Sequence, residues 1–271
     1  MPAQEVTTEA PGSIGILRHH MLETFRESPS LFRATYIDKT VDQEEMSAAM
    51  RLGLACDYTV LSGRAADVTV IEEKLVRSTS KESMAKKDQI KTEALAKDGV
   101  WLTHSENVRL QRMVDACAKD REFQELLAKN HEAQKRLFWT CQWTGLPKRG
   151  TLDYVADQII DLKTTGSWNL HHRRIFRHIF DRGTHRQLAM YQEGWLTLTG
   201  QKLPTSIVYV GNDQPHDVVV IPVDQTVVDL GCEENRQTCN DLADALAYGD
   251  WRTPLKRQRP TMMLTNFNIP G

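Results

Sequence analysis

The sequence predicts an α/β fold in which helices flank a central mixed β-sheet. Two patterns carry this prediction: apolar residues recur at helical spacing up to about residue 129, and strand-length apolar runs follow from residue 135 onward. The composition agrees, because 271 residues with 40% hydrophobic and 26% charged side chains are typical of a globular protein, not of a disordered or collagen-like one. We expect a flexible N-terminus over residues 1–12, a single domain over residues 13–255 and an extended tail over residues 256–271.

Helices are predicted for the first part of the domain. Apolar spacing predicts a helix from Ser13 to about Glu27, which the sequence Ser28-Pro29-Ser30 ends. Residues 42–45, with the sequence DQEE, resemble a capping box. They predict a second helix that runs to about Leu61 and stops at Gly63.

The middle of the chain is rich in lysine. Residues 81–97 predict a solvated helix or a mobile segment, and a capping box at residues 103–106 predicts a long amphipathic helix to about Lys129. Beyond it the sequence predicts strands at 135–142, 150–156, 158–164, 205–212 and 217–223, and helices at 168–180, 184–198 and 225–248.

Several chemistries are excluded by what the sequence lacks. The five cysteines are an odd number without a C-x-x-C pair, so we expect reduced thiols, not a disulfide framework or a four-cysteine zinc site. No G-x-x-x-x-G-K-[ST] loop occurs, so this chain carries no recognisable nucleotide-hydrolysis motif. The first twenty residues lack an apolar signal segment, and the longest obvious apolar run, residues 218–221, is far too short to cross a membrane. We therefore expect a cytoplasmic protein without a membrane partner.

An apolar hairpin carries the charged residues of greatest interest. If its turn is centred on Asp157, Asp153 lies directly opposite Asp161, and directly opposed β-carbons are about 4.5–5.5 Å apart. Lys163 lies two residues beyond Asp161, so it shares the same face of the strand. The neighbouring residues are apolar on both faces, which predicts a central position in the sheet, where an unpaired charge is costly.

One lysine does not balance two aspartates that also repel each other. The simplest alternative is an Asp–Lys ion pair at the end of a sheet. A divalent cation such as Mg²⁺, or Mn²⁺ in its place, balances both carboxylates, and such ions bind through one or two carboxylates with phosphate and water. Lys163 would then orient the attacking water or stabilise the charge that develops on phosphorus. Asp153, Asp161 and Lys163 thus predict metal-assisted hydrolysis of a phosphodiester.

The order Asp153, then Asp161-Leu162-Lys163, resembles the signature of the PD-(D/E)xK nucleases, with Leu152 in place of the proline. The chain resembles the phage-type exodeoxyribonuclease VIII (RecE-like) proteins within the RecB-like nuclease group. Short motifs in the family's order carry this resemblance over roughly residues 13–255. They are Ser28-Pro29 with Phe32, Leu52-Gly53 with Ala55, Phe138-Trp139-Thr140 with Thr144-Gly145-Leu146-Pro147, and Gln187 with Tyr191.

The resemblance implies a restriction-endonuclease-like core and an ATP-independent exonuclease on the ends of linear double-stranded DNA, working in phage-type recombination. It also implies a ring-like homo-oligomer and a single-strand annealing protein as partner. The implied metal ligands are Asp57, Asp153, Asp161 and Leu162. Two other functions stay open: a catalytically weakened DNA-binding or assembly protein that keeps the nuclease fold, and an endonuclease on the same core.

Two positions depart from the family pattern. Asp57 stands four residues after Gly53, where relatives usually carry a histidine; aspartate also binds Mg²⁺, so the exchange either preserves or weakens the site. Taken alone, Asp57 is more typical of a solvated helix residue. Gln134 stands where relatives usually carry a glutamate, and the nearby Glu132 is two residues out of register.

Gln187 and Tyr191 are four residues apart and therefore share a helix face. The resemblance implies that they hold DNA near the active site. Residues 184–187 also resemble a capping box, in which Gln187 would only cap its own helix.

The near-neutral net charge of −2 conceals a segregation of charge. Residues 135–186 contain ten Lys and Arg against four Asp and Glu, whereas residues 203–250 contain nine Asp and Glu against one Arg. Arg173, Arg174 and Arg177 follow the proposed site on one helix, so we predict that they contact DNA phosphates. The alternative is an exposed helix that is basic without binding DNA.

Overall fold

The computed structural model describes residues 14–41 and 45–252 of the chain. The predicted flexible N-terminus, residues 1–12, and the predicted extended tail, residues 256–271, lie outside the described residues. The chain divides into two compact units. The minor unit comprises residues 1–43, 140–147 and 236–271, and the major unit comprises residues 44–139 and 148–235.

Short helices form the minor unit. They are α1 (His19–Glu27), α2 (Pro29–Phe32), a π-helical turn (Arg33–Ile37) and the end of α10 (Gln225–Tyr248). Helix α1 begins at His19, not near Ser13 as predicted. Gly15 adopts a left-handed φ of 61°, and the Leu17 N–H donates to the Pro147 carbonyl at 2.9 Å, so this stretch does not continue the helix.

The Ser-Pro-x-x-Phe motif is a capped turn that anchors an aromatic cluster. Ser28 Oγ accepts an N–H from the first turn of α2, and Pro29 takes the first helical position, where its missing N–H costs nothing. Phe32 is fully buried. Its ring meets Phe25 edge-on at 5.5 Å and stacks on Trp251 at 6.2 Å. The motif therefore has a packing role in this unit.

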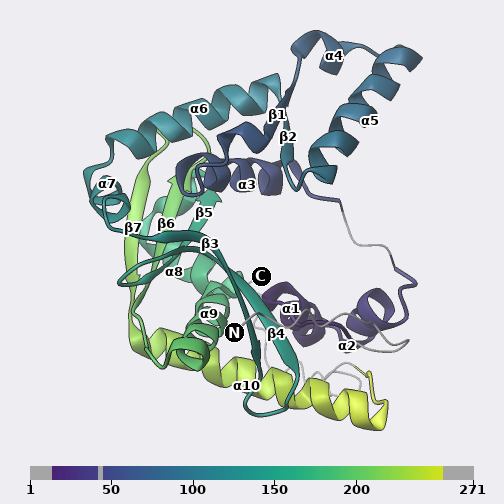
Figure 1. Cartoon of the computed structure of the whole chain (residues 1–271), viewed down its shortest axis with the longest axis vertical. Coiled ribbons are helices and arrows are strands. Elements are labelled where there is room, and N and C mark those ends of the chain that lie inside the picture. The colour runs from purple at the N-terminus through teal and green to yellow at the C-terminus, as the bar shows by residue number, and fades with distance from the viewer. Residues whose placement is uncertain (1–13, 42–44, 253–271) are drawn as a thin grey trace, which may run out of the picture. The chain divides into compact units, whose positions relative to one another are not determined.

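A five-stranded sheet forms the centre of the major unit, in the order β3-β4-β5-β6-β7 (Figure 1). Strands β5 and β6 pair in parallel, whereas β4 with β5 and β6 with β7 pair antiparallel, so the sheet is mixed as predicted. The strands are β3 (Glu132–Thr140), β4 (Pro147–Val155), β5 (Ile159–Thr165), β6 (Thr205–Gly211) and β7 (Val218–Val223).

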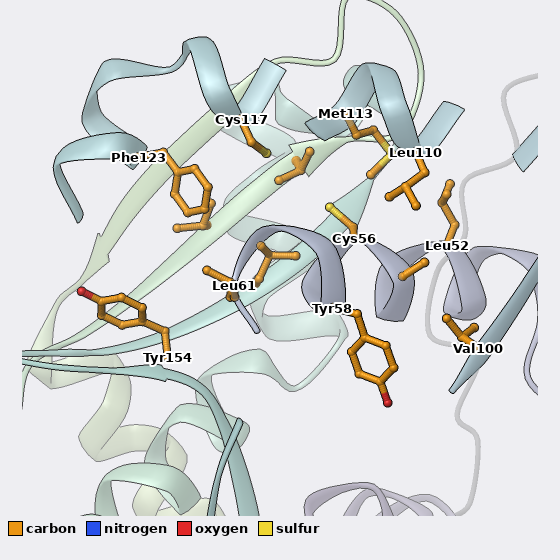
Figure 2. Close-up of a cluster of buried hydrophobic side chains, with 14 of the residues drawn as sticks. Leu52, Cys56, Tyr58, Leu61, Val100, Leu110, Met113, Cys117, Phe123 and Tyr154 are labelled. Carbon is orange, nitrogen blue, oxygen red and sulfur yellow. The ribbon is translucent and has the colours of Figure 1, made fainter. Parts of the chain in front are cut away.

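Helices cover both faces of this sheet. Val208 and Val210 of β6 pack into a cluster with side chains of the helices on one face, whereas Ile207 and Tyr209 pack with those on the other. Alternate residues of a strand point to opposite faces, which separates the two cores. The first face carries α3 (Ala48–Val60), α6 (His104–Lys119) and α7 (Arg121–Leu127), and the second carries α8 (His172–Asp181) and α9 (Thr184–Thr199). Figure 2 shows the first core, where Cys56, Leu61, Met113 and Cys117 pack together.

The predicted capping box that opens α6 is confirmed. Thr103 accepts the Glu106 N–H, and Glu106 Oε2 accepts the Thr103 N–H at 2.7 Å. The helix was expected to continue to Lys129, but it ends at Lys119. Asp120 interrupts it, because its Oδ1 accepts the Phe123 N–H at 2.8 Å and so caps a separate helix, α7.

Helix α3 begins at Ala48, where the Ser47 side chain caps it. The capping box predicted at residues 42–45 falls mostly on residues 42–44, which lie outside the described residues. The helix ends at Val60, close to the predicted end, and Gly63 follows in a left-handed conformation with φ of 63°.

A small parallel pair, β1 (Val68–Ile71) with β2 (Val100–Thr103), was not predicted. Strands of four residues are too short to show a clear alternation in sequence. Helices α4 (Glu73–Arg77) and α5 (Lys81–Ala96) lie between them in the chain. Helix α5 carries the lysine-rich stretch with mostly exposed side chains, so the expectation of a solvated helix is confirmed.

The five cysteines are free thiols, as expected, and four of them are buried. Across the part of the chain that the structure describes, no helix is both long and apolar enough to cross a membrane.

Candidate active site

The β4–β5 hairpin has the predicted register. Tyr154 pairs with Ile160 and Val155 with Ile159, as expected for a turn centred on Asp157. One residue beyond this ladder, the Asp153 carboxylate takes over the role of a backbone acceptor: its Oδ2 accepts the N–H of Leu162 at 2.9 Å. This hydrogen bond fixes the Asp153 side chain against the central strand β5.

Asp161 and Lys163 lie on β5, which pairs with β4 on one side and β6 on the other. The Asp161 side chain is fully buried, and the Lys163 Nζ lies 3.0 Å from its Oδ1 and 2.9 Å from its Oδ2. Burial alone would lower the pKa of Lys163, but the negative charges of Asp161 and Asp153 outweigh it and raise that pKa above its usual value. The Lys163 ammonium therefore stays protonated, and its side chain keeps 31% of its surface exposed.

Gln187 connects this ion pair to helix α9. Its Oε1 accepts from Lys163 Nζ at 3.0 Å, and its Nε2 donates to Asp161 Oδ1 at 3.1 Å and to the Tyr191 hydroxyl at 2.7 Å. The alternative that Gln187 caps its own helix is wrong. The N-cap is Gly183, in a left-handed conformation with φ of 66°, and no side chain caps this helix.

Tyr191 is buried, so its ring is part of the site's packing and its hydroxyl is held by Gln187. Burial raises the pKa of the Tyr191 phenol well above its usual value, and the negative charge of Asp161 adds to this effect. The phenol is therefore neutral at physiological pH. That Gln187 and Tyr191 also hold DNA stays a prediction.

Asp57 of α3 reaches the same site and is only 6% exposed, so the alternative of a solvated helix residue is wrong. Its Oδ2 accepts a hydrogen bond from Gln134 Nε2 at 2.6 Å, and the same nitrogen lies 3.5 Å from Asp153 Oδ1. Gln134 adopts a left-handed φ of 51°, which is uncommon for a residue other than glycine and is found where the surrounding structure imposes it.

The carboxyl groups of the site repel each other. Burial and the charge of Asp161 raise the pKa of Asp57 to about 7. Burial and then the charges of Asp161 and Asp57 raise the pKa of Asp153 well above its usual value. The charge of Lys163 lowers the pKa of Asp57 and of Asp153 but does not cancel this repulsion. The site therefore favours an additional positive charge.

A divalent cation fits these residues. Asp57 Oδ1 is buried without a hydrogen-bond partner among the described residues, and it is a carboxylate oxygen of the kind that Mg²⁺ prefers. No group of three or more His, Cys, Asp or Glu side chains is arranged as a metal cage within the described ranges. A cation would thus take only part of its ligands from Asp57, Asp153, Asp161 and the Leu162 backbone, and the rest from water and phosphate.

A buried ion pair that the sequence did not reveal holds α9 against the sheet. Lys148 Nζ lies 2.9 Å from Glu193 Oε2, and both side chains are almost completely buried. Trp139 Nε1 donates to Glu193 Oε1 at 3.2 Å. Lys148 is one of the ten basic residues of the 135–186 segment, but its burial keeps its charge away from the surface. A strand with buried residues at every second position, as β4 has, was the available signal that Lys148 points inward.

Two glycines allow this close docking. A Cβ atom at Gly150 would lie 3.0 Å from the ring of Tyr191, and one at Gly194 would lie 2.9 Å from the ring of Trp139. Any larger residue at either position would push α9, and with it Gln187, away from β5.

The three predicted DNA-binding arginines, Arg173, Arg174 and Arg177, lie on α8 and are exposed. Within the described residues, none of them hydrogen-bonds to Asp153, Asp161 or Lys163, so the structure does not bring them into the carboxylate cluster. Arg186, which also contributed to the basic segment, pairs with Glu234 at 2.8 Å. Within residues 135–186, exposed arginines thus gather on α8.

Comparisons with known proteins agree with this fold. A family model described as "PDDEXK-like domain of unknown function (DUF3799)" matches residues 19–253. No curated protein sequence matches the chain. A solved structure from Eubacterium rectale, which carries the provisional name of exonuclease, is similar with a TM-score of 0.62 and 15% identity over 91% of this chain and 89% of that chain.

An alkaline exonuclease from Laribacter hongkongensis (LHK-Exo) matches with a TM-score of 0.32 and 13% identity, over 72% of this chain and 95% of its own, which is too low to establish a shared fold. The family model, in contrast, spans most of the chain and includes the β4–β5 hairpin with Asp153, Asp161 and Lys163. The chain belongs to the PDDEXK-like domain family and has its nuclease-like fold.

Proposed function

We propose that this chain is a Mg²⁺-dependent exonuclease that hydrolyses phosphodiester bonds of linear double-stranded DNA, with Mn²⁺ able to replace Mg²⁺. The observation that carries the proposal is that Asp161 holds one protonated lysine at 2.9 Å, while the Gln134 amide lies between Asp57 and Asp153, two carboxyl groups whose pKa values the charge of Asp161 raises. Such a group favours a divalent cation and a phosphate together. The exonuclease name of the similar Eubacterium rectale structure supports the direction of the proposal.

The residues that would hold the cation are Asp57, Asp153, Asp161 and the carbonyl of Leu162. When bound, a divalent cation supplies positive charge that polarises a phosphoryl oxygen and lowers the pKa of water. The carboxylates of Asp153 and Asp161 would hold the cation near the end of the β4–β5 ladder, where a hydrogen bond from the Leu162 N–H fixes the Asp153 side chain.

Lys163 supplies the remaining positive charge. Its Nζ is oriented from one side by Asp161 and from the other by Gln187, each at about 3 Å, while part of its side chain stays accessible. An ammonium held in this way donates hydrogen bonds to phosphate oxygens as negative charge develops on them. Gln187 positions Lys163 and Asp161 through its side-chain hydrogen bonds, and we propose that Gln187 and Tyr191 also hold DNA near the site.

The experiment is a cleavage assay on linear and covalently closed duplex DNA, with Mg²⁺ or EDTA. We expect Mg²⁺-dependent loss of the linear substrate alone. Asp161→Asn and Lys163→Met should abolish cleavage while the proteins stay folded. The matched control is Asp157→Asn, which removes an exposed acid from the same hairpin whose only described partner is Lys129. Cleavage in EDTA, or full activity of the Lys163→Met protein, would contradict the proposal.

Two other functions are outcomes of the same assay. Cutting of the closed circle would identify an endonuclease. Binding without cleavage would identify a catalytically weakened DNA-binding or assembly protein, and one observation favours that candidate: an amide, Gln134, faces Asp57 and Asp153 where a carboxylate would add a metal ligand.

A RecE-like role in phage-type recombination, a ring-like homo-oligomer and a single-strand annealing partner complete the proposal. They are supported by the order of the short motifs in the sequence. Size-exclusion chromatography with light scattering tests the oligomer, and a purely monomeric protein would contradict it.

A further inference from the structure

An exposed tryptophan lies just beyond the catalytic strand. Trp168 keeps 66% of its surface exposed, although large aromatic side chains usually bury most of theirs. It belongs to a short 3₁₀ turn (Ser167–Leu170) that connects β5 to α8. Trp168, His171, Arg173 and Arg174 line an open hollow of about 480 Å³. We refer to these four residues as the tryptophan platform.

The platform is held in shape by specific contacts. The Arg174 guanidinium carbon lies 4.8 Å from the centre of the indole ring, which is a cation–π contact. The His171 ring meets the indole nearly edge-on at 5.8 Å. Below it, Asn169 Nδ2 donates to Thr165 Oγ1 at 3.1 Å and ties the turn to the last residue of β5. Arg174 and His171 therefore contact the indole, and the turn that carries it is tied to β5.

The tryptophan platform is also close in sequence to the candidate active site. Trp168 follows Lys163 by five residues, which even fully extended span at most about 17 Å. Successive nucleotides of one strand rise about 3.4 Å, so this reach corresponds to roughly five nucleotides. A strand whose phosphate lies at Lys163 therefore needs to extend by only a few nucleotides to reach the indole.

We propose that the tryptophan platform binds an unpaired base of the DNA strand by stacking it on Trp168, while Arg173 and Arg174 contact the flanking phosphates. The inference rests on the proposed function, because the strand to be cleaved is the ligand. Charge favours this occupant: the described platform carries two arginines and no acid, which fits a polyanion. An indole stacks on any base because every base has a π-face, so the binding is independent of sequence.

The platform would thus favour substrates with a single-stranded or frayed end. A fully paired base has both faces covered by its neighbours and does not reach the indole without unstacking. At a duplex end, the tryptophan platform would bind the strand that has separated from its complement and keep that strand near Lys163.

The test measures binding in EDTA, so that no cleavage occurs. A duplex with a ten-nucleotide single-stranded tail is compared, by fluorescence anisotropy, with the same duplex whose tail is abasic and keeps only sugar and phosphate. Stacking of one base is worth about 5- to 100-fold in affinity. We expect the normal tail to bind tighter by this factor. Trp168→Ala should remove the preference, and Trp168→Phe should keep most of it.

Two further variants separate base stacking from charge. Arg173→Ala should weaken binding of both tails equally, because phosphates are present in both. Phe176→Leu changes another exposed aromatic residue on α8 and should leave the preference at the wild-type value. A 2-aminopurine base in the tail should be quenched by wild type and not by the Trp168→Ala protein, with thermal melting as the check that this protein is folded.

The result that would overturn the platform is equal affinity of wild type for the two tails, or an unchanged preference in the Trp168→Ala protein. Cleavage with Mg²⁺ is scored separately. A base preference that depends on Trp168 in a protein that does not cleave would reject the nuclease and keep the platform. Cleavage without any base preference would do the reverse.

Discussion

Gln134 donates a 2.6 Å hydrogen bond to Asp57 from a residue 77 positions further along the chain, and it does so from a left-handed backbone conformation. Its amide also lies within 3.5 Å of Asp153, so one neutral side chain separates two carboxylates that repel each other. The strained conformation indicates that the side chain is directed into the site by the surrounding structure.

Replacement of Gln134 by Glu should lower the stability of the metal-free protein and raise its affinity for Mg²⁺. A fourth carboxylate in the site, facing Asp57 and Asp153, raises the repulsion, and we expect the metal-free protein to lose about 1–3 kcal/mol of unfolding free energy. The same charge should tighten Mg²⁺ binding by about tenfold, or ~1.4 kcal/mol. Urea unfolding in EDTA and calorimetric titration with Mg²⁺ measure the two effects. Lys135→Ala, at the next position, is the control, and unchanged metal affinity in the Gln134→Glu protein would contradict the prediction.

The metal-free protein should become less stable as the pH rises from about 4 to about 7. Burial and Asp161 raise the pKa of Asp57 in the folded state to about 7, above its value in the unfolded chain. The folded state then binds the proton more tightly, so this stabilisation is complete below the unfolded pKa and is lost as the pH rises through 7. The slope approaches about 1.4 kcal/mol per pH unit.

Thermal unfolding in EDTA between pH 5 and 7.5 tests this dependence. Asp57→Asn should reduce the slope, and Asp153, whose pKa is also raised, should account for what remains. Asp157→Asn should not reduce the slope, because a hydrogen bond from Lys129 lowers the pKa of Asp157, and this carboxyl titrates below that range. A wild-type protein that gains stability toward pH 7 would contradict the raised pKa values of Asp57 and Asp153.

For the buried Lys148–Glu193 ion pair, removal of one charge should reduce the unfolding free energy more than removal of both charges. Lys148→Met leaves the Glu193 carboxylate buried and uncompensated, which costs about 3–5 kcal/mol of unfolding free energy. Lys148→Met combined with Glu193→Leu removes both charges and should recover most of that loss. Urea unfolding of the two single variants and the double variant gives the coupling. Additive losses would mean that the two side chains do not interact.

Gly194→Ala should reduce activity through displacement of α9. Its Cβ would lie 2.9 Å from the Trp139 ring, and relieving such a clash costs about 1–3 kcal/mol, which exceeds the gain of about 1 kcal/mol from the better helix propensity of alanine. Gln187 then loses its alignment with Lys163, so we expect kcat to fall with little change in KM. Thr197→Ala, on an exposed position of the same helix, is the comparison. A Gly194→Ala protein with higher stability and normal kcat would contradict the close packing.

The parts of the fold that local rules govern were predictable from the sequence. The Thr103–Glu106 capping box and the hairpin register at Tyr154 and Ile160 follow from residues close together in the chain. The proximity of Asp153, Asp161 and Lys163 was predictable for the same reason, because the turn of a β-hairpin determines which residues of its two strands oppose each other.

The rest of the site depends on contacts between distant segments. Nothing near Gln134 in sequence indicates its left-handed conformation or its bond to Asp57. Gln187 was open to two interpretations, and the choice depends on Gly183, whose left-handed turn starts α9 without a side-chain cap. The burial of Lys148 in an ion pair was not predictable from the sequence, because its partner, Glu193, lies 45 residues away in the chain.

Asp161 and Lys163 lie in the parallel β5–β6 ladder, where they pair with Ile207 and Tyr209, and this determines how the site is lost when the protein unfolds. Amide protons in such a ladder exchange with solvent only when the whole unit opens, whereas those of the 3₁₀ turn at Trp168 exchange through small local openings. The Asp161–Lys163 ion pair is therefore disrupted only when the sheet unfolds. Hydrogen exchange would show one slow rate for the amides of both residues. Molecules in which the sheet is folded would retain the Asp161–Lys163 ion pair.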